Sequence, residues 1–153
     1  IFASSDLVGT GNGDSAICHW SDLRSLAKLP GVTVQSHAAS HTNLTRLSSS
    51  DVMHELRRSK EQIQVQVERE VTEIAYPRGK WSPDIVGIAS ALGYSRGWTT
   101  DPVGLNWMSA NPMAQPRVVA NRGESATSIL GRTRTGGRVL ATMRGRRPDK
   151  KAM

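Results

Sequence analysis

Apolar positions recur along the chain with two different spacings, and segments of the two kinds alternate. Short runs rich in β-branched and apolar residues predict strands, and these cover residues 1–4, 32–35, 70–76, 94–99 and 117–120. Segments with apolar residues three or four positions apart predict helices, and these cover residues 21–29, 49–67 and 84–92. A last helical turn or two is expected within residues 124–130.

Start and stop signals support the longer helices. Ser48 is in position to cap residues 49–67, and Ser82 before Pro83 is typical of a helix start. Gly93 predicts the end of the helix that Pro83 begins. The apolar stripe of the longest helix is expected to consist of Val52, Leu56, Ile63 and Val67, and to exclude Ser59.

The alternation of strands and helices indicates an α/β fold with parallel strands. Right-handed crossovers would bring the carboxyl ends of all strands to one rim of the sheet. His37, residues 76–78 and residues 99–101 each follow an expected strand. The sequence therefore predicts that three polar clusters meet where α/β proteins usually place their sites.

Positive charge gathers at the carboxyl end. The chain of 153 residues has 20 Lys and Arg against 13 Asp and Glu, a formal net charge of +7. Residues 131–153 contain eight of the basic residues and one acidic residue, so residues 1–130 are neutral overall. We expect a folded domain over 1–130 and a basic, disordered tail over 131–153. Nucleic-acid binding through the tail is the least favoured hypothesis, because the body is neutral and has no recognition motif.

Other composition features set limits. The single cysteine, Cys18, excludes an internal disulfide and a multi-cysteine zinc site. No apolar run approaches the length of a membrane span. The opening residues Ile1 to Ala3 are typical of the inside of a strand, so we expect an N-terminal truncation, and the compartment stays unassigned.

Two histidines are the main candidates for chemistry. His37 and His41 lie four residues apart directly after an expected strand, so both imidazoles can reach one divalent ion. The zinc-protease helix motif is excluded because it requires Glu where Ala38 stands. A third ligand, often a carboxylate, is still needed, and a pair of solvated histidines is the alternative. Residues 76–79 could present backbone N–H groups to an oxyanion, or could simply form a strand-ending turn.

Several motifs occur in the order in which they follow one another in a known protein family. Residues 37–44, followed by Leu47 and Ser48, resemble the metal-binding motif of the polysaccharide deacetylase family, the chitooligosaccharide deacetylase homology domain. Residues 74–79 resemble the third motif of that family. Residues 99–102 and 116–118 resemble its branch of exopolysaccharide poly-N-acetylglucosamine deacetylases.

The resemblance, which covers roughly residues 1–130, implies an incomplete distorted (β/α) barrel that lacks its first strand. It implies a hydrolase acting on linear amide C–N bonds, which removes N-acetyl groups from an N-acetylglucosamine-containing polysaccharide or oligosaccharide. The cofactor implied is a divalent metal, expected to be Zn²⁺, held by two His and one Asp, with a second Asp as the base. Family members are often extracytoplasmic or associated with the cell envelope.

Carried over residue by residue, the resemblance makes His37 and His41 metal ligands. The main-chain N–H of Arg78 would serve the oxyanion, and Tyr76 and Pro77 would contact the substrate. The aspartate pair of the family's first motif is expected upstream of Ile1, so we expect this chain to be inactive alone. A non-catalytic glycan- or metal-binding member of the same fold is the alternative.

The chain also departs from the family pattern within these motifs. Ala38 replaces the usual Ser or Thr, and Ala75 stands where many members carry an Arg that orients the base. Asp6 follows a different strand and is not assigned to the site. No late Leu-x-His segment supplies the usual acid histidine.

Overall fold

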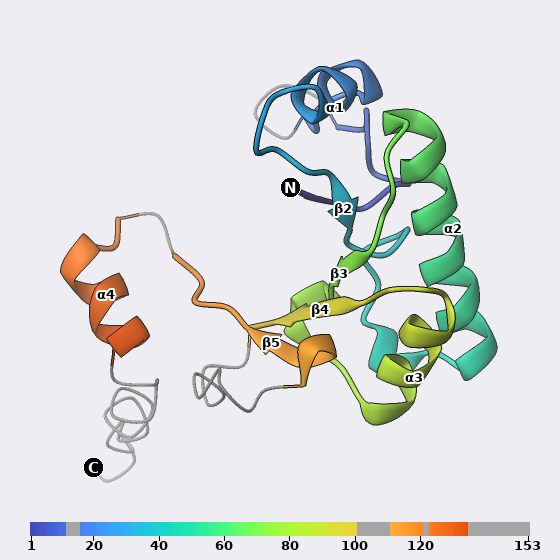
Figure 1. Cartoon of the computed structure of the whole chain (residues 1–153). Helices are drawn as coiled ribbons and strands as arrows, with labels where there is room; N and C mark the ends of the chain where they lie inside the picture. Colours follow the sequence, from blue (N-terminus) through green and yellow to red (C-terminus); the bar gives the residue numbers. More distant parts are fainter. Residues whose placement is uncertain (12–15, 101–110, 121–122, 135–153) are drawn as a thin grey trace, which may run out of the picture.

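Five parallel strands form a single sheet in the order β1-β2-β3-β4-β5 (Figure 1). The computed structural model describes residues 1–11, 16–100, 111–120 and 123–134. The strands are β1 Phe2–Ala3, β2 Gln35–Ser36, β3 Glu73–Ala75, β4 Arg96–Thr99 and β5 Gln115–Pro116. This arrangement confirms the predicted α/β fold with parallel strands.

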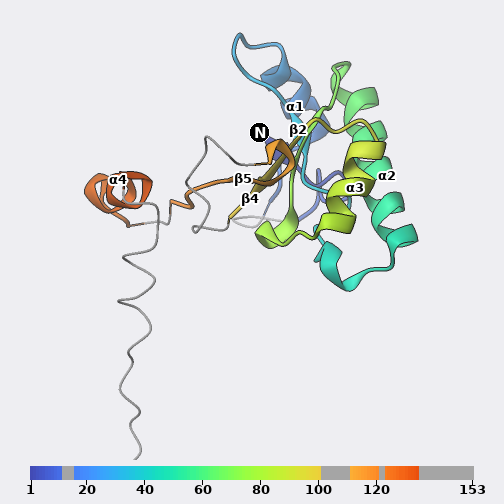
Figure 2. The same cartoon turned by 60° about the horizontal axis from the view of Figure 1, so that its bottom comes forward.

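Three helices connect the first four strands and lie on one side of the sheet (Figures 1 and 2). They are α1 Trp20–Ala27, α2 Ser49–Val67 and α3 Pro83–Ala91, and a further helix, α4 Ala126–Arg134, follows β5. Short 3-10 turns are η2 Leu44–Arg46, η3 Pro77–Gly79 and η5 Pro112–Ala114. Among the described helices, none is long and apolar enough to cross a membrane.

The strand register sorts side chains onto two faces. Paired residues of parallel strands share a face, and successive residues alternate. Ser36 pairs with Ile74, and both point toward the helices, where they are fully buried. The opposite, open face carries Phe2, Gln35, Glu73, Arg96, Trp98 and Gln115. This face continues beyond the strand ends to His37.

The open face is concave, because side chains from the two ends of the sheet meet across it. The Phe2 ring lies 6.5 Å from the Trp98 ring, and the Arg117 guanidinium lies 5.3 Å from the Phe2 ring. In a flat sheet, β1 and β5 would be about 19 Å apart, at about 4.8 Å per strand. The sheet therefore curls, as the wall of a partial barrel does.

Helix α2 has the predicted bounds, and one prediction about its faces was wrong. Ser48 caps it by accepting a hydrogen bond from the Asp51 N–H at 3.2 Å. The predicted apolar stripe is buried, but so is Ser59. Position 59 lies three residues after Leu56 and four before Ile63, so it faces the core. Its hydroxyl is satisfied there by the Ser36 hydroxyl at 2.9 Å.

Helix α3 lies one residue earlier than the predicted 84–92, and its start and stop signals act as predicted. The Ser82 hydroxyl accepts a hydrogen bond from the Ile85 N–H at 3.3 Å, and Pro83 occupies the first turn. Gly93 follows with a φ of 80°, a conformation that favours glycine.

The last two elements differ from the prediction. The strand expected at 117–120 is instead β5 at Gln115–Pro116, because Gln115 and Pro116 are the residues that pair with β4. Arg117 adds one more hydrogen bond, from its N–H to the Thr99 carbonyl at 3.1 Å. Helix α4 extends past the predicted end at residue 130 to Arg134, within the segment assigned to the tail. The rest of that tail, and Asp101, lie outside the described residues.

Candidate metal centre

The two histidines occupy the loop that leaves the carboxyl end of β2. The His37 N–H donates to the Ala3 carbonyl at 2.8 Å, which extends the pairing of β2 with β1. The Ser4 hydroxyl donates to the His37 carbonyl at 2.9 Å. The main chain of His37 is thus fixed on both sides by the end of β1.

The rings of His37 and His41 are neighbours, with centroids 4.8 Å apart and an angle of 61° between the planes. The Nδ1 atom of His37 lies 2.5 Å from the carbonyl oxygen of Ala75 on β3. A carbonyl can only accept, so Nδ1 must carry a proton, and in the neutral ring Nε2 then keeps its lone pair. This is the tautomer that presents Nε2 to a metal.

The environment of His37 favours the neutral ring. Burial is the main cause that lowers the pKa of His37, and the hydrogen bond to Ala75 opposes it. The charges of His41 and Arg117 lower the pKa of His37 further. A neutral imidazole is the form that binds a metal ion.

The backbone at this rim adopts unusual conformations. Ala38, His41 and Arg78 have φ values of 60°, 61° and 58°. The fourth non-glycine residue with positive φ in the described chain is Glu68, which ends α2 as its C-cap. Left-handed conformations of non-glycine residues cost about 1–3 kcal/mol each and tend to gather at functional sites.

Helix α2 holds the histidine loop through two side chains. The Glu55 carboxylate accepts hydrogen bonds from the Ser40 N–H at 3.0 Å and from the Ser40 hydroxyl at 3.1 Å. One turn further along α2, Ser59 holds Ser36, whose hydroxyl also accepts from the Ala38 N–H at 3.2 Å. No sequence motif marks either residue for the site, although their spacing of four places them on one side of the helix.

The turn after β3 buries two residues that were expected to contact the substrate. Tyr76 and Pro77 are buried, and the Tyr76 hydroxyl donates to the Met113 carbonyl at 2.8 Å. The tyrosine side chain is therefore part of the core and does not face the rim. Arg78 is exposed.

The turn that contains Arg78 is closed by two backbone hydrogen bonds. The Gly79 N–H donates to the Tyr76 carbonyl at 2.8 Å, and the Lys80 N–H donates to the Pro77 carbonyl at 3.2 Å. A Cβ added at Gly79 would lie 2.0 Å from the Thr100 hydroxyl oxygen. The turn thus packs too closely against the end of β4 to move easily.

A third metal ligand is not found in the described part of the chain. There, no group of three His, Cys, Asp or Glu side chains is placed to hold a metal ion. The acidic side chain nearest in sequence to β1, Asp6, forms an ion pair with Arg58 on α2. Its N–H donates to the Ala39 carbonyl at 3.0 Å, so Asp6 supports the loop.

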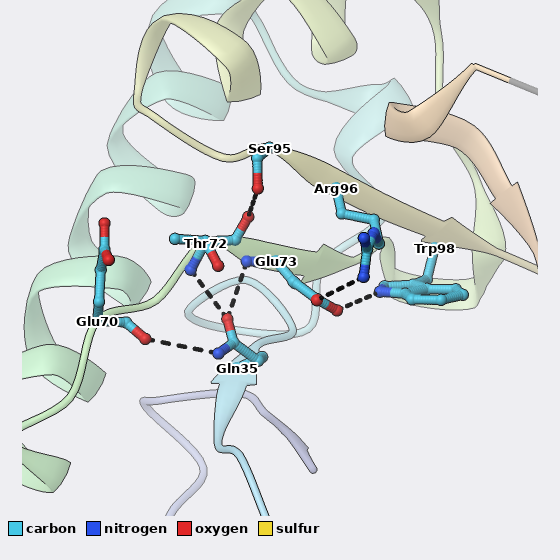
Figure 3. A network of polar contacts seen from close by, with 7 residues as sticks. All are labelled: Gln35, Glu70, Thr72, Glu73, Ser95, Arg96 and Trp98. Carbon is cyan, nitrogen blue, oxygen red and sulfur yellow. Dashed lines mark hydrogen bonds and ion pairs between the residues drawn. The ribbon is translucent and has the colours of Figure 1, made fainter.

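Polar groups on the open face form hydrogen bonds with one another (Figure 3). The Gln35 side-chain oxygen accepts from the N–H groups of Thr72 and Glu73 at 2.9 and 2.8 Å. The Glu73 carboxylate accepts from Arg96 at 3.1 Å and from the Trp98 indole at 2.7 Å. Within this network the charges of Glu73 and Arg96 pair with each other.

A curled parallel sheet covered by helices on one side, with two neighbouring histidines at its carboxyl rim, places the chain among the α/β proteins. The family model for polysaccharide deacetylase matches residues 7–97, and the chain belongs to this family. It is 29% identical to the putative polysaccharide deacetylase YxkH of Bacillus subtilis over 72 residues. These residues are 47% of this chain and 26% of that protein.

Solved structures show the same fold. The polysaccharide deacetylase BC0361 from Bacillus cereus matches with a TM-score of 0.71 and 21% identity, over 87% of this chain and 40% of that chain. The Streptococcus pyogenes deacetylase PplD, solved in complex with acetate, matches with a TM-score of 0.66 and 22% identity, over 79% and 53%. The chain therefore spans about half or less of the length of these three relatives. These likenesses confirm the α/β class and the partial barrel.

Proposed function

We propose that this chain carries part of the active site of a metal-dependent carbohydrate N-deacetylase, with His37 and His41 as two of the metal ligands. The observation that supports this most is the hydrogen bond from His37 Nδ1 to the Ala75 carbonyl, beside the His41 ring 4.8 Å away. It fixes one tautomer of the neutral ring and leaves the Nε2 lone pair for a metal ion. Zn²⁺ is the ion we propose, because imidazole nitrogen suits it and the family is generally metal-dependent.

The described residues fit such an ion in donor type, and each has a definable part in hydrolysis. A divalent ion, when bound, would polarise the acetamide carbonyl and lower the pKa of a water molecule. His37 and His41 would hold that ion at the rim. The Arg78 N–H would donate a hydrogen bond to the carbonyl oxygen as negative charge develops on it. Ala75 keeps His37 in the ligand tautomer throughout.

The third ligand and the base would be carboxylates from outside the described residues. We propose an N-acetylglucosamine-containing polymer as the substrate class, on the strength of family membership and of the motif resemblance at residues 99–102 and 116–118. The exopolysaccharide branch is part of this proposal. We propose that neither carboxylate belongs to this chain, so this chain alone should release little acetate from N-acetylglucosamine oligomers, and vigorous release would show that the base has been misplaced.

The test of the ligands is zinc binding by His37→Ala and His41→Ala, with His54→Ala as the matched control. His54 lies on α2 and is exposed, so its loss removes an imidazole without touching the loop. We expect each ligand variant to lose at least about tenfold in zinc affinity, since one coordinate bond is removed. Equal zinc affinity in all three variants would refute the assignment.

The absence of a third ligand among the described residues keeps one other function open. A non-catalytic member of the fold would bind metal or glycan through the same rim without turnover. The two functions are separated by acetate release in any longer form of this protein. Acetate release, together with an adjacent pair of aspartates at the end of a further strand, supports the enzyme.

A further inference from the structure

Three hydroxyl groups meet in the core next to the histidine loop, and together they form what we call the buried hydroxyl chain. They belong to Ser36 on β2, Ser59 on α2 and Tyr94 between α3 and β4. The two serines are fully buried, and Tyr94 is 3% exposed. The serine oxygens lie 2.9 Å apart, and the Tyr94 hydroxyl donates to the Leu56 carbonyl of α2 at 2.9 Å.

The direction of each hydrogen bond in the buried hydroxyl chain follows from the single proton of each hydroxyl. Tyr94 uses its proton on the Leu56 carbonyl, because a carbonyl can only accept. Burial raises the pKa of Tyr94, and a hydrogen bond from Ser36 opposes that rise, so Ser36 donates to the phenol oxygen. Ser36 then has no proton left for Ser59, and Ser59 must donate to Ser36.

The Ser36 oxygen has one more partner, in the histidine loop. It accepts a hydrogen bond from the Ala38 N–H at 3.2 Å, in addition to the one from Ser59. Two accepted bonds and one donated bond use the full capacity of a hydroxyl. The orientation of the Ser36 hydroxyl is therefore set by Ser59 and Tyr94, and in that orientation a lone pair meets Ala38.

Ala38 is the residue at which the backbone turns between the two histidines. It is fully buried and has a φ of 60°, a conformation that alanine rarely adopts. The N–H and the carbonyl of His37 are both held by the end of β1. Since His37 is fixed, the conformation of Ala38 decides the direction in which the chain continues to His41.

We propose that the buried hydroxyl chain positions the metal site, because Ser36, oriented by Tyr94, holds Ala38 in its left-handed conformation and so sets the spacing of the His37 and His41 rings. The inference rests on the proposed function, since that spacing matters to an ion that binds both rings. Ser36 and Tyr94 are positioning residues that act through the backbone of Ala38. Side chains that orient metal ligands in this way contribute to metal affinity.

The test compares zinc affinity, measured by chelator competition on the full chain, with ring-to-ring nuclear Overhauser effects between His37 and His41 in the metal-free chain. Ser36→Ala leaves the Ala38 N–H without its acceptor and should weaken zinc binding about tenfold and abolish the ring-to-ring signal. Ser59→Ala keeps the bond from Ala38 to Ser36, so zinc affinity should fall less than about twofold. Tyr94→Phe frees the Ser36 proton to turn toward Ser59 and should cost about threefold.

Tyr76→Phe is the matched control for Tyr94→Phe. The Tyr76 hydroxyl is also buried and also donates to a carbonyl, that of Met113 at 2.8 Å. Each variant loses one such bond, so both should lower the melting temperature by a similar few degrees. Only Tyr94→Phe should weaken zinc binding, and equal zinc affinities in the two variants would overturn the inference.

The double variant Ser36→Ala/Ser59→Ala separates positioning from stability. Ser36→Ala alone leaves the Ser59 hydroxyl buried without its partner, and the second substitution removes that hydroxyl, so the melting temperature should partly recover. The Ala38 N–H still has no acceptor in the double variant, so zinc affinity should stay about tenfold low. A recovery of zinc affinity together with the melting temperature would make the buried hydroxyl chain merely structural. Unchanged zinc affinity in Ser36→Ala would equally overturn the inference.

The metal-free signal keeps this inference separate from its basis. If the unmodified chain binds no zinc, the proposed metal centre fails, and the ring-to-ring signal then decides the positioning role. Its loss in Ser36→Ala and its retention in Ser59→Ala and Tyr76→Phe would support that role. The same signal in all of these variants would contradict it.

Discussion

The contact between β4 and the turn before β5 can be tested at a single glycine. Gly97 is buried in β4, and a Cβ added there would lie 2.2 Å from the Met113 carbonyl oxygen and 2.6 Å from the Tyr76 hydroxyl. These two atoms are hydrogen bonded to each other at 2.8 Å. Gly97→Ala must therefore push η5 away from the sheet or break that bond.

The cost follows from two effects. Overpacking a buried site typically costs about 1–3 kcal/mol. Losing the Tyr76 hydrogen bond adds about 1 kcal/mol. We expect Gly97→Ala to lower the free energy of unfolding by about 2–4 kcal/mol, measured by urea denaturation of the full chain.

Gly87 offers a matched control with the opposite sign. It lies within α3, and a Cβ added there would meet nothing within 4 Å. Gly87→Ala should stabilise the chain by about 0.5–1 kcal/mol through helix propensity. If both variants shift the free energy of unfolding in the same direction, the close packing of β4 against η5 is wrong.

Three more substitutions on α2 and at its end test how this helix holds the histidine loop and how it terminates. Glu55→Gln should weaken zinc binding about tenfold by loosening the Ser40 contacts, and unaltered zinc competition with a chelator would contradict this. Ser59→Ala should cost about 1 kcal/mol in urea unfolding by removing the partner of Ser36, whereas the exposed Ser50→Ala should cost less than half of that. Glu68→Gly should stabilise by about 1 kcal/mol, because Glu68 ends α2 with a φ of 54°; a lower melting temperature would count against the left-handed cap.

Local signals were sufficient for the long helices. Ser48 and the apolar period predicted α2 to the residue, because a cap and a 3.6-residue repeat are properties of one short segment. The paired parts of the strands are shorter than predicted, since β-propensity marks extended backbone and pairing depends on the neighbouring strand. For the same reason β5 was placed two residues too late.

The features that make the rim a site are mostly contacts between distant residues. His37 and His41 were predicted from spacing and resemblance, but nothing in the sequence indicates that Ala75 fixes the His37 ring. The left-handed backbone at Ala38 is equally hidden, because alanine rarely adopts it. Glu55 and Arg117 act through residues 15 and more positions away.

The most direct test of the central claim is the coordination of His37 itself. Long-range ¹H–¹⁵N spectra of the imidazoles, recorded while zinc is added to the full chain, report which ring nitrogen carries the proton and which binds the metal. The account predicts that His37 keeps its proton on Nδ1, held by the Ala75 carbonyl, and that Nε2 of His37 and a nitrogen of His41 shift together at the same zinc concentration. Binding through Nδ1 of His37, or zinc shifts confined to His19 or His54, would contradict it.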